Sequence, residues 1–221
     1  MVLQYNGIDG CRGGWILASI SHEKLTFKFL KSLSEIITNN LLIIDMPVIC
    51  PETIKDYPRN EDKLAKSYLG NNHASIFYAP VDSWLSQSFS EINQTCQNNT
   101  KPKLSIQSYN LFKKITELQL QKNTYQFIES HPECVFKRYN NNRNLNSKKT
   151  SEGINQREEI LSQHLSLNNL PSLHPSCDIF FKNHKSVCMY DDCLDACILA
   201  ILNYDYHTKK THQCFGKHVI Y

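Results

Sequence analysis

The sequence predicts an α/β domain with one mixed sheet and helices on both faces. Three strand-like segments follow one another near the N-terminus with short links, so we expect them to be antiparallel neighbours. A continuously apolar segment at 41–44 follows a short helix, so we expect it to run parallel to one of the three. The chain has 221 residues, of which 41% are apolar and 20% charged, enough for a packed core without disulfides.

The first elements are separated by turn residues. Strands are predicted at 2–9, 15–20 and 25–30. The glycines of the 11–14 segment permit positive φ in the turn between the first two strands. Ser32 can cap a short helix that extends to Ile37. The strand at 41–44 ends at Asp45-Met46-Pro47, where proline interrupts strand pairing.

The rest of the chain is mainly helical. Helices are predicted at 59–69 (ended by Gly70), 84–96, 104–120, 152–166 and 191–206. A strand is predicted at 125–129, a mobile basic loop at 137–149, and a last strand at 215–221. This order is that of a ribonuclease H-like core in a single domain, 1–221, with a helical insertion at about 50–122.

Composition narrows the class of protein. The net charge is +3, from 24 basic and 21 acidic side chains, so charge alone does not indicate a nucleic-acid binder. The longest apolar run, 196–202, is far shorter than the ~18–20 residues of a membrane span. The N-terminus lacks the basic and apolar regions of a secretory signal. We expect a cytoplasmic protein whose nine cysteines are mostly reduced thiols.

Acidic residues stand at the ends of three predicted strands. Asp9 ends the first, Asp45 follows the fourth, and Glu129 ends the fifth. Carboxyl ends of parallel strands meet at one edge of a sheet, so we expect these carboxylates to converge. Asp192 and Asp195 share one face of the last helix. Such oxygen ligands suit Mg²⁺ or Mn²⁺, and a pair of these ions can activate water against a phosphodiester.

Each acidic residue also has a simpler interpretation. Asp9 can shape a glycine-rich turn, and Asp45 can cap a loop. Glu129 can pair with a basic neighbour. Asp191 can be an N-cap residue, and the next two aspartates of that helix favour its N-terminal dipole.

Basic residues provide candidate phosphate contacts. Those considered are Arg12, Lys114, Lys148, Lys149 and Arg157. Each can instead be a solvated surface charge. The C-terminal part also gathers Cys and His residues, but without the close Cys pairs of zinc sites, so buried thiols are the favoured interpretation.

Short motifs occur in one order from residue 7 to about residue 200. They are Gly7-Ile8-Asp9-Gly10-Cys11-Arg12-Gly13-Gly14-Trp15, Asp45-Met46-Pro47, Arg59 with Asp62 and Ala65, Ser75 with Phe77 and Pro80, Gln107 with Lys114-Ile115-Thr116-Glu117, Glu129-Ser130-His131-Pro132-Glu133, Lys148-Lys149-Thr150 with Gly153 and Arg157, and Asp191-Asp192 with Asp195-Ala196.

Through these motifs the chain resembles an uncharacterised family of predicted ribonuclease H-like nucleases. The resemblance implies a divalent-metal-dependent nuclease or phosphodiesterase acting on nucleic acid or a small phosphodiester. The implied catalytic set is Asp9, Asp45, Glu129, Asp192 and Asp195. Of these, the implied metal ligands are Asp9, Asp45, Glu129 and Asp192. A second group is His131, which can relay a proton or be structural, and Glu133.

The chain departs from the family pattern at a few positions that spare the carboxylates. They are Ile49-Cys50-Pro51, His73, Asp82 and Gln119. Two other functions stay open. An actin-like or sugar-kinase-like nucleotide-binding protein shares the Gly-x-Asp-Gly opening, although such proteins usually need two domains of this size. A binding or scaffold module would keep the acidic cleft without turnover.

Overall fold

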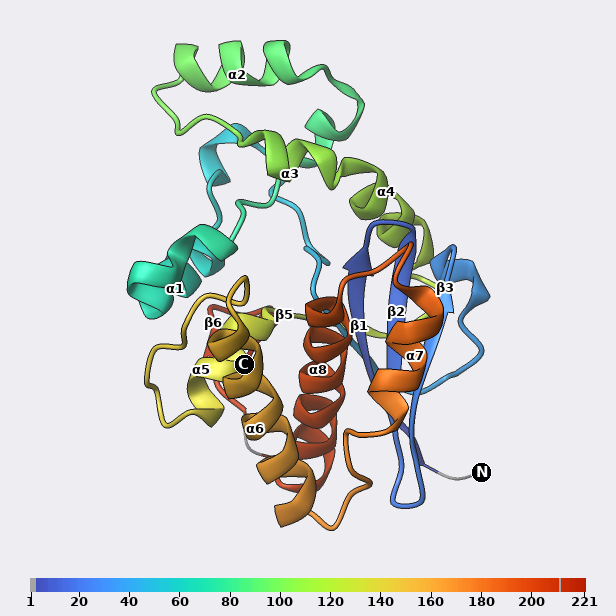
Figure 1. Ribbon diagram of the computed structural model, residues 1–221. Helices are drawn as coiled ribbons and strands as arrows, with labels where there is room; N and C mark the ends of the chain where they lie inside the picture. The colour runs from blue at the N-terminus through green and yellow to red at the C-terminus, as the bar shows by residue number, and fades with distance from the viewer. Residues whose placement is uncertain (1–2, 211) are drawn as a thin grey trace.

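The computed structural model describes residues 3–210 and 212–221, and these form a mixed α/β structure (Figure 1). Seven strands in this part of the chain make one sheet of order β3-β2-β1-β4-β5-β7-β6. They are β1 (Tyr5–Cys11), β2 (Gly14–Ile20), β3 (Leu25–Leu30), β4 (Leu42–Ile44), β5 (Phe127–Ser130), β6 (Cys214–Phe215) and β7 (Val219–Ile220).

The sheet is mixed, as predicted. β1 pairs antiparallel with β2, and β2 antiparallel with β3. β4 lies parallel to β1, β5 parallel to β4, and β7 parallel to β5. The carboxyl ends of β1, β4 and β5 therefore meet at one edge of the sheet.

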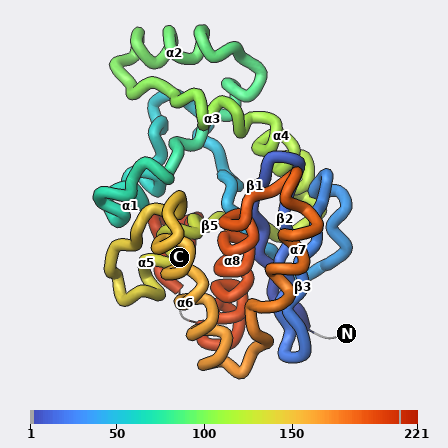
Figure 2. Tube along the Cα trace, viewed as in Figure 1, coloured from blue at the N-terminus to red at the C-terminus, as the bar shows by residue number. Residues whose placement is uncertain are grey.

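Eight α-helices lie in the described residues. They are α1 (Asn60–Leu69), α2 (Phe89–Asn98), α3 (Ile106–Asn110), α4 (Phe112–Gln121), α5 (Pro132–Tyr139), α6 (Ser151–Leu167), α7 (Ser176–His184) and α8 (Tyr190–Thr208). Residues 45–126, here called the β4–β5 segment, carry α1–α4, and their trace rises beyond the sheet in Figure 2. Within the described residues, no helix is both long and apolar enough to cross a membrane.

Several predictions for individual elements were wrong or incomplete. The helix predicted at 104–120 is divided at Leu111 into α3 and α4. The segment after β5 forms helix α5 at once, because Pro132 at its first turn has the φ of a helix and lacks only an N–H that would be unpaired there. The predicted loop therefore begins only at Asn140. The predicted last strand is a hairpin, β6–β7, which turns at Gly216 with φ 60°. Helix α7 was not predicted.

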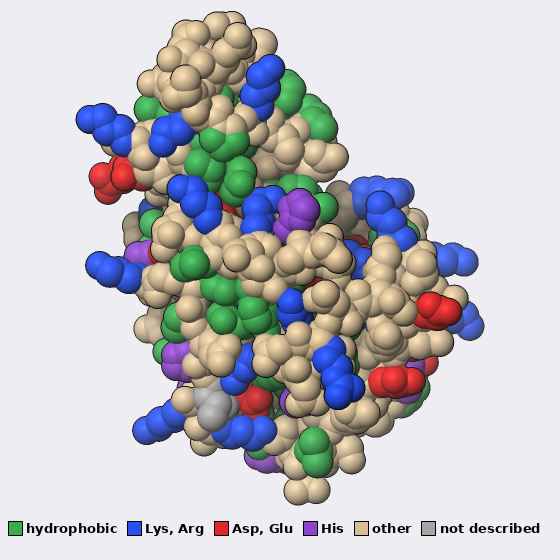
Figure 3. Space-filling model, turned by 90° about the vertical axis from the view of Figure 1, so that its left-hand side faces the viewer, with side chains coloured by type: hydrophobic (Ala, Val, Ile, Leu, Met, Phe, Trp, Pro, Cys, Tyr) green, Lys and Arg blue, Asp and Glu red, His purple; other side chains and the backbone are tan. Residues whose placement is uncertain are grey.

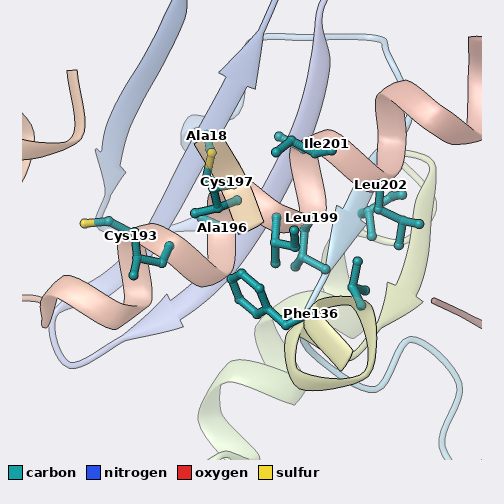
Figure 4. Close-up of a cluster of buried hydrophobic side chains, with 14 of the residues drawn as sticks. Ala18, Phe136, Cys193, Ala196, Cys197, Leu199, Ile201 and Leu202 are labelled. Atoms are coloured by element: carbon teal, nitrogen blue, oxygen red, sulfur yellow. The ribbon is translucent and has the colours of Figure 1, made fainter. Parts of the chain in front are cut away.

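Each face of the sheet has its own apolar core. On one face α8 packs on β1, β2 and β4, and every residue from Cys193 to Asp205 is buried. Figure 4 shows Ala18 of β2 beside Cys197 of α8, with Phe136 of α5 below the same helix. On the other face, Ile115 and Leu118 of α4 pack with apolar residues of β1 and β4. A third core, around Tyr57 and Trp84, lies within the β4–β5 segment.

Candidate functional site

A pocket of about 630 Å³ lies at the carboxyl edge of the sheet. Four of its lining residues are aspartates from three places in the chain: Asp9 in β1, Asp45 directly after β4, and Asp192 and Asp195 in the first turns of α8. The loop at 146–149 and the β4–β5 segment form its other walls. The structure thus brings together four of the five predicted catalytic residues.

Gly7 explains how α8 comes so close to β1. A Cβ atom at Gly7 would lie 2.3 Å from the carbonyl oxygen of Ala196 and 2.3 Å from the nitrogen of Ala200. Only glycine therefore permits this contact between strand and helix. Asp9 lies two residues further along β1, on the same face, so its side chain meets the first turns of α8.

Asp9 is buried among like charges. It is 6% exposed, and burial is the largest cause that raises its pKa well above the usual range. The charges of Asp195, Asp45 and Asp192 raise it further, while Lys148 opposes them. An ionised Asp9 thus lacks sufficient positive charge around it.

Only one of the two carboxylate oxygens of Asp195 has a hydrogen-bond partner in the described residues. Its Oδ2 accepts a 2.8 Å hydrogen bond from Lys148 Nζ, which also lies 3.1 Å from Asp191 Oδ2. Its buried Oδ1 has no hydrogen-bond partner in the described residues. Burial raises the pKa of Asp195 to about 7, although Lys148 opposes the shift. Charge pairing with Asp195 in turn raises the pKa of Lys148.

The loop that carries Lys148 is held by the start of α6. Thr150 caps α6, and a Cβ atom at Gly153 would lie 2.1 Å from the carbonyl oxygen of Ser147. Arg157 Nη1 donates to the carbonyl of Asn146, 3.1 Å away. These contacts fix the backbone on both sides of Lys148.

Asp192 closes the N-terminus of α8. The N-cap residue is Met189, not Asp191 as predicted, and Oδ2 of Asp192 at the N3 position accepts a 2.7 Å hydrogen bond from the backbone N–H of Met189. Burial raises the pKa of Asp192, while the hydrogen bond from Met189 lowers it.

His131 lies between two carboxylates. Its Nδ1 is 3.5 Å from Asp45 Oδ1, and its Nε2 is 4.0 Å from Glu129 Oε1. Burial disfavours the charged imidazole, but the hydrogen bond and charge of Asp45 and the charges of Glu129 and Asp62 together raise the pKa of His131. Its Nε2 has no hydrogen-bond partner within the described part of the chain.

Glu129 forms a buried ion pair. Its Oε1 lies 2.5 Å from Arg59 Nη2, its Oε2 accepts from Arg59 Nη1 at 2.9 Å, and Oε2 also accepts from the Val48 N–H. Arg59 bonds Asp62 in the same way, at 2.6 Å. Glu129 does not line the pocket. Its pairing with Arg59 agrees with the interpretation of Glu129 as the partner of a basic residue, and not as a metal ligand.

One group of side chains could hold a metal ion by the spacing of its atoms. Ligand atoms of Asp62, Glu129 and His131 all lie within 4.8 Å of one another, and all three residues are buried. The guanidinium of Arg59 already bonds both carboxylates of this group. A cation there would have to displace Arg59, whereas among the described residues the ion pairs of the pocket aspartates are those of Asp195 with Lys148 and of Asp45 with His131.

Glu133 and Arg157 form a second buried pair. Two Arg157 nitrogens donate to Glu133, and the third donates to the carbonyls of Asn146 and Gly153. Both side chains line the pocket. With every nitrogen bonded to the protein, Arg157 positions Glu133 and the Lys148 loop, and its predicted phosphate contact has no free donor here.

Two of the other predicted basic residues, Arg12 and Lys114, lie outside the pocket lining. Arg12 is exposed in the β1–β2 turn. Lys114 lies on α4, donates to the carbonyl of Gly14, and sits 4.3 Å from the ring centre of Trp15. Burial lowers the pKa of Lys114. Lys148 and Lys149 line the pocket.

Sequence reasoning did not assign a site role to Phe77, which lines the pocket, or to Arg59 and Asp62, which lie outside its lining. Arg59 and Asp62 carried only the family resemblance, and Phe77 likewise; their positions relative to the pocket depend on contacts between distant segments. The nine cysteines are all free thiols, eight of them buried. The C-terminal Cys and His residues form no group with metal-ligand spacing in the described residues.

Fold and site together define an α/β protein with an acidic pocket at the carboxyl edge of a mixed sheet. The chain belongs to the family described as Protein of unknown function (DUF429), whose model matches residues 7–218. This confirms the expected membership of an uncharacterised family, while the nuclease activity stays a prediction. No match was found among curated proteins or among solved structures.

Proposed function

We propose that this protein is a divalent-metal-dependent phosphodiesterase of the nuclease type, built on a ribonuclease H-like fold. The observation that carries the proposal is the convergence of Asp9, Asp45, Asp192 and Asp195 on one pocket, with a buried Asp195 oxygen that has no partner among the described residues. The substrate would be nucleic acid or a related phosphodiester.

The order of the strands supports the fold assignment. The part of the sheet ordered β3-β2-β1-β4-β5 has two antiparallel pairings followed by two parallel ones. This is the order expected for a ribonuclease H-like core, in which the acidic residues stand at the ends of β1 and β4. Fold alone does not fix activity, so the argument depends on the pocket.

The side chains of the pocket fit a hard cation. Four aspartates line the pocket beside Lys148 and Lys149, and burial raises the pKa of Asp9, Asp192 and Asp195 although the charge of Lys148 opposes each shift. Mg²⁺ and Mn²⁺ prefer oxygen ligands of this kind. Asp9, Asp45 and Asp192 would hold the ion, with Asp195 beside them. Glu129 would join them only if Arg59 moved. A bound ion would supply a nucleophilic water and stabilise the leaving oxygen.

The remaining side chains of the pocket would prepare this site. Lys148 would keep Asp195 ionised and place a positive charge where a phosphate approaches. His131 would hold Asp45 through Nδ1 and offer Nε2 for a proton. Glu133, fixed by Arg157, would add a second acidic group at the rim.

The test is calorimetric titration of Mn²⁺ and Mg²⁺ into wild type and Asp9→Asn. We expect Asp9→Asn to lose Mn²⁺ binding, because the variant removes a buried negative ligand without changing side-chain size. Glu159→Gln, which removes one exposed negative charge on α6, is the matched control and should bind as wild type does.

Activity is then measured on DNA, RNA and a small phosphodiester with both variants. Loss of cleavage in Asp9→Asn alone supports the enzyme. Metal binding without turnover on any of these substrates favours the binding or scaffold module. A wild type that binds neither ion, even with an oligonucleotide present, contradicts the proposal. Stabilisation by ATP would favour the nucleotide-binding alternative.

A further inference from the structure

The wall of the pocket that faces the aspartates has a different chemistry. It comes from residues 71–115 of the β4–β5 segment, and its side chains are apolar, aromatic, amide or hydroxyl groups. They include Asn71, Phe77, Tyr78, Gln107 and Leu111. None of these is a metal ligand of the usual kind, so the proposed metal chemistry does not account for this wall.

Phe77 is a large apolar residue that does not pack in any apolar core of the described chain. It is half-buried, lines the pocket, and belongs to none of the three apolar clusters found in the described residues. Its ring has no aromatic partner in that part of the chain, whereas Tyr78 beside it packs on Tyr57. A large apolar ring left open in a pocket is a common feature of a ligand contact.

The backbone around Phe77 is held firmly. Ile76 is 2% exposed and anchors the segment in the main core. Two residues after Phe77, the Ala79 N–H donates to Asp62 Oδ2 at 3.0 Å, and Asp62 is itself bonded by Arg59. The position of the ring is therefore set before any ligand binds, which lowers the entropy cost of binding.

Two amide side chains line the same pocket as the Phe77 ring and make no side-chain hydrogen bond in the described residues. The two residues, Asn71 and Gln107, are exposed. They come from two different elements of the β4–β5 segment, since Asn71 lies shortly after α1 and Gln107 lies in α3. A primary amide offers both a donor and an acceptor, which matches the edge of a nucleobase.

We propose that this wall is a nucleobase subsite, in which Phe77 stacks on one unpaired base while Asn71 and Gln107 bond its edge. The inference rests on the proposed function, since the aspartates would act on the phosphodiester attached to that base. Stacking on an aromatic ring is tolerant of base identity, so the subsite would select single-stranded nucleic acid more than a particular sequence.

A paired base cannot reach this ring without leaving its stack, so duplex is disfavoured as a substrate. The outer surface is compatible with a phosphate chain. Lys and Arg side chains are scattered over the face drawn in Figure 3, and Asp and Glu side chains appear only in a few places. Positive charge of this kind attracts a strand without reading its sequence.

The test compares two labelled strands of about eight nucleotides each, oligothymidylate and an abasic strand with the same backbone, by fluorescence anisotropy in Ca²⁺. We expect wild type to bind the thymidine strand about fivefold or more tightly than the abasic strand. Phe77→Ala should abolish this difference, and Phe77→Trp should retain it. Phe27→Ala, which removes a half-buried ring on the edge strand β3, is the matched control.

Equal binding of both strands by wild type overturns the subsite, and so does a preference that survives in Phe77→Ala. Thermal melting of each variant shows that it is folded. The calorimetric Mn²⁺ titration separates the two proposals: a base preference without metal binding contradicts the phosphodiesterase and keeps the subsite. Metal binding without a base preference contradicts the subsite and keeps the phosphodiesterase.

Discussion

Arg59 holds together three segments that are distant in the chain. Its side chain is 8% exposed, and it bonds Asp62 and Glu129, which are both fully buried. Burial opposes the charge of Arg59, but the two carboxylates together raise its pKa. Through Asp62 the same network reaches the backbone of Ala79, beside the proposed base-binding wall.

Arg59→Met should destabilise the protein strongly. The variant would leave two buried carboxylates without their cation, a loss of about 3–5 kcal/mol in the free energy of unfolding. Urea denaturation measures this loss. Lys63→Met, at an exposed position of α1, is the control and should change stability by less than about 0.5 kcal/mol. A similar small effect for Arg59→Met would show that the network contributes little.

The candidate site could be predicted from sequence where its residues follow local rules. Asp9 and Asp45 stand at strand ends, and the spacing of Asp192 and Asp195 places both on one helical face, so their convergence followed from sheet topology. The partners of Glu129 and Glu133 could not be foreseen. Arg59 is 70 residues from Glu129 and Arg157 is 24 residues from Glu133, and no local pattern reports contacts at such separations.

The packing of α8 on β1 places two of the four aspartates. The contact depends on Gly7, because the backbone of α8 occupies the space where a Cβ atom would lie. A residue noted from the sequence only as part of a predicted strand and a family motif therefore sets the distance between a strand and a helix. Helix and strand have little freedom to adjust, since both are buried in the main core.

Gly7→Ala should separate α8 from β1 and weaken the site. We expect a loss of about 1–3 kcal/mol in stability from overpacking, and Mn²⁺ binding weaker by about tenfold or more because Asp192 and Asp195 move away from Asp9. Calorimetry and urea denaturation measure the two effects. In Gly70→Ala, where φ is 59° and the space around the Cβ is open, only strain of about 1 kcal/mol is expected. Unchanged Mn²⁺ affinity in a folded Gly7→Ala would refute this view of the contact.

The elements themselves were predictable to different degrees. The strand at 25–30 and the helix ended by Gly70 have clear periodicity and a clear stop signal, and the structure confirms both. Helix α7 and the β6–β7 hairpin are short, and their stability comes from packing against β3 and β5 more than from their own residues. Propensity and pattern carry little information about such elements.

The fold of the whole molecule brings negatively charged aspartates together at one edge of the sheet, where their burial and mutual repulsion are unfavourable. Its net charge is only +3, yet the pocket concentrates four aspartates against Lys148. The apolar cores on both faces must therefore offset the cost of burying Asp9 and Asp195. A bound cation would relieve this cost, so metal binding and folding stability should be linked.

This linkage predicts how stability depends on pH without metal. The folded state raises the pKa of Asp195 to about 7, from 3.8, and raises that of Asp9 as well. The folded protein thus holds protons that the unfolded chain has released, so this contribution is present in full below about pH 4 and is lost as pH rises toward 7. For Asp195 the difference amounts to a few kcal/mol.

Urea denaturation in EDTA at pH 5 and at pH 8 tests this expectation. Wild type should be less stable at pH 8, and Asp195→Asn, which cannot ionise, should lose less stability between the two pH values. Mn²⁺ should restore the stability of wild type at pH 8 and have little effect on Asp9→Asn. Equal pH dependence in wild type and Asp195→Asn would mean that Lys148 fully compensates Asp195, and the pocket would then have no electrostatic need for a cation at that carboxylate.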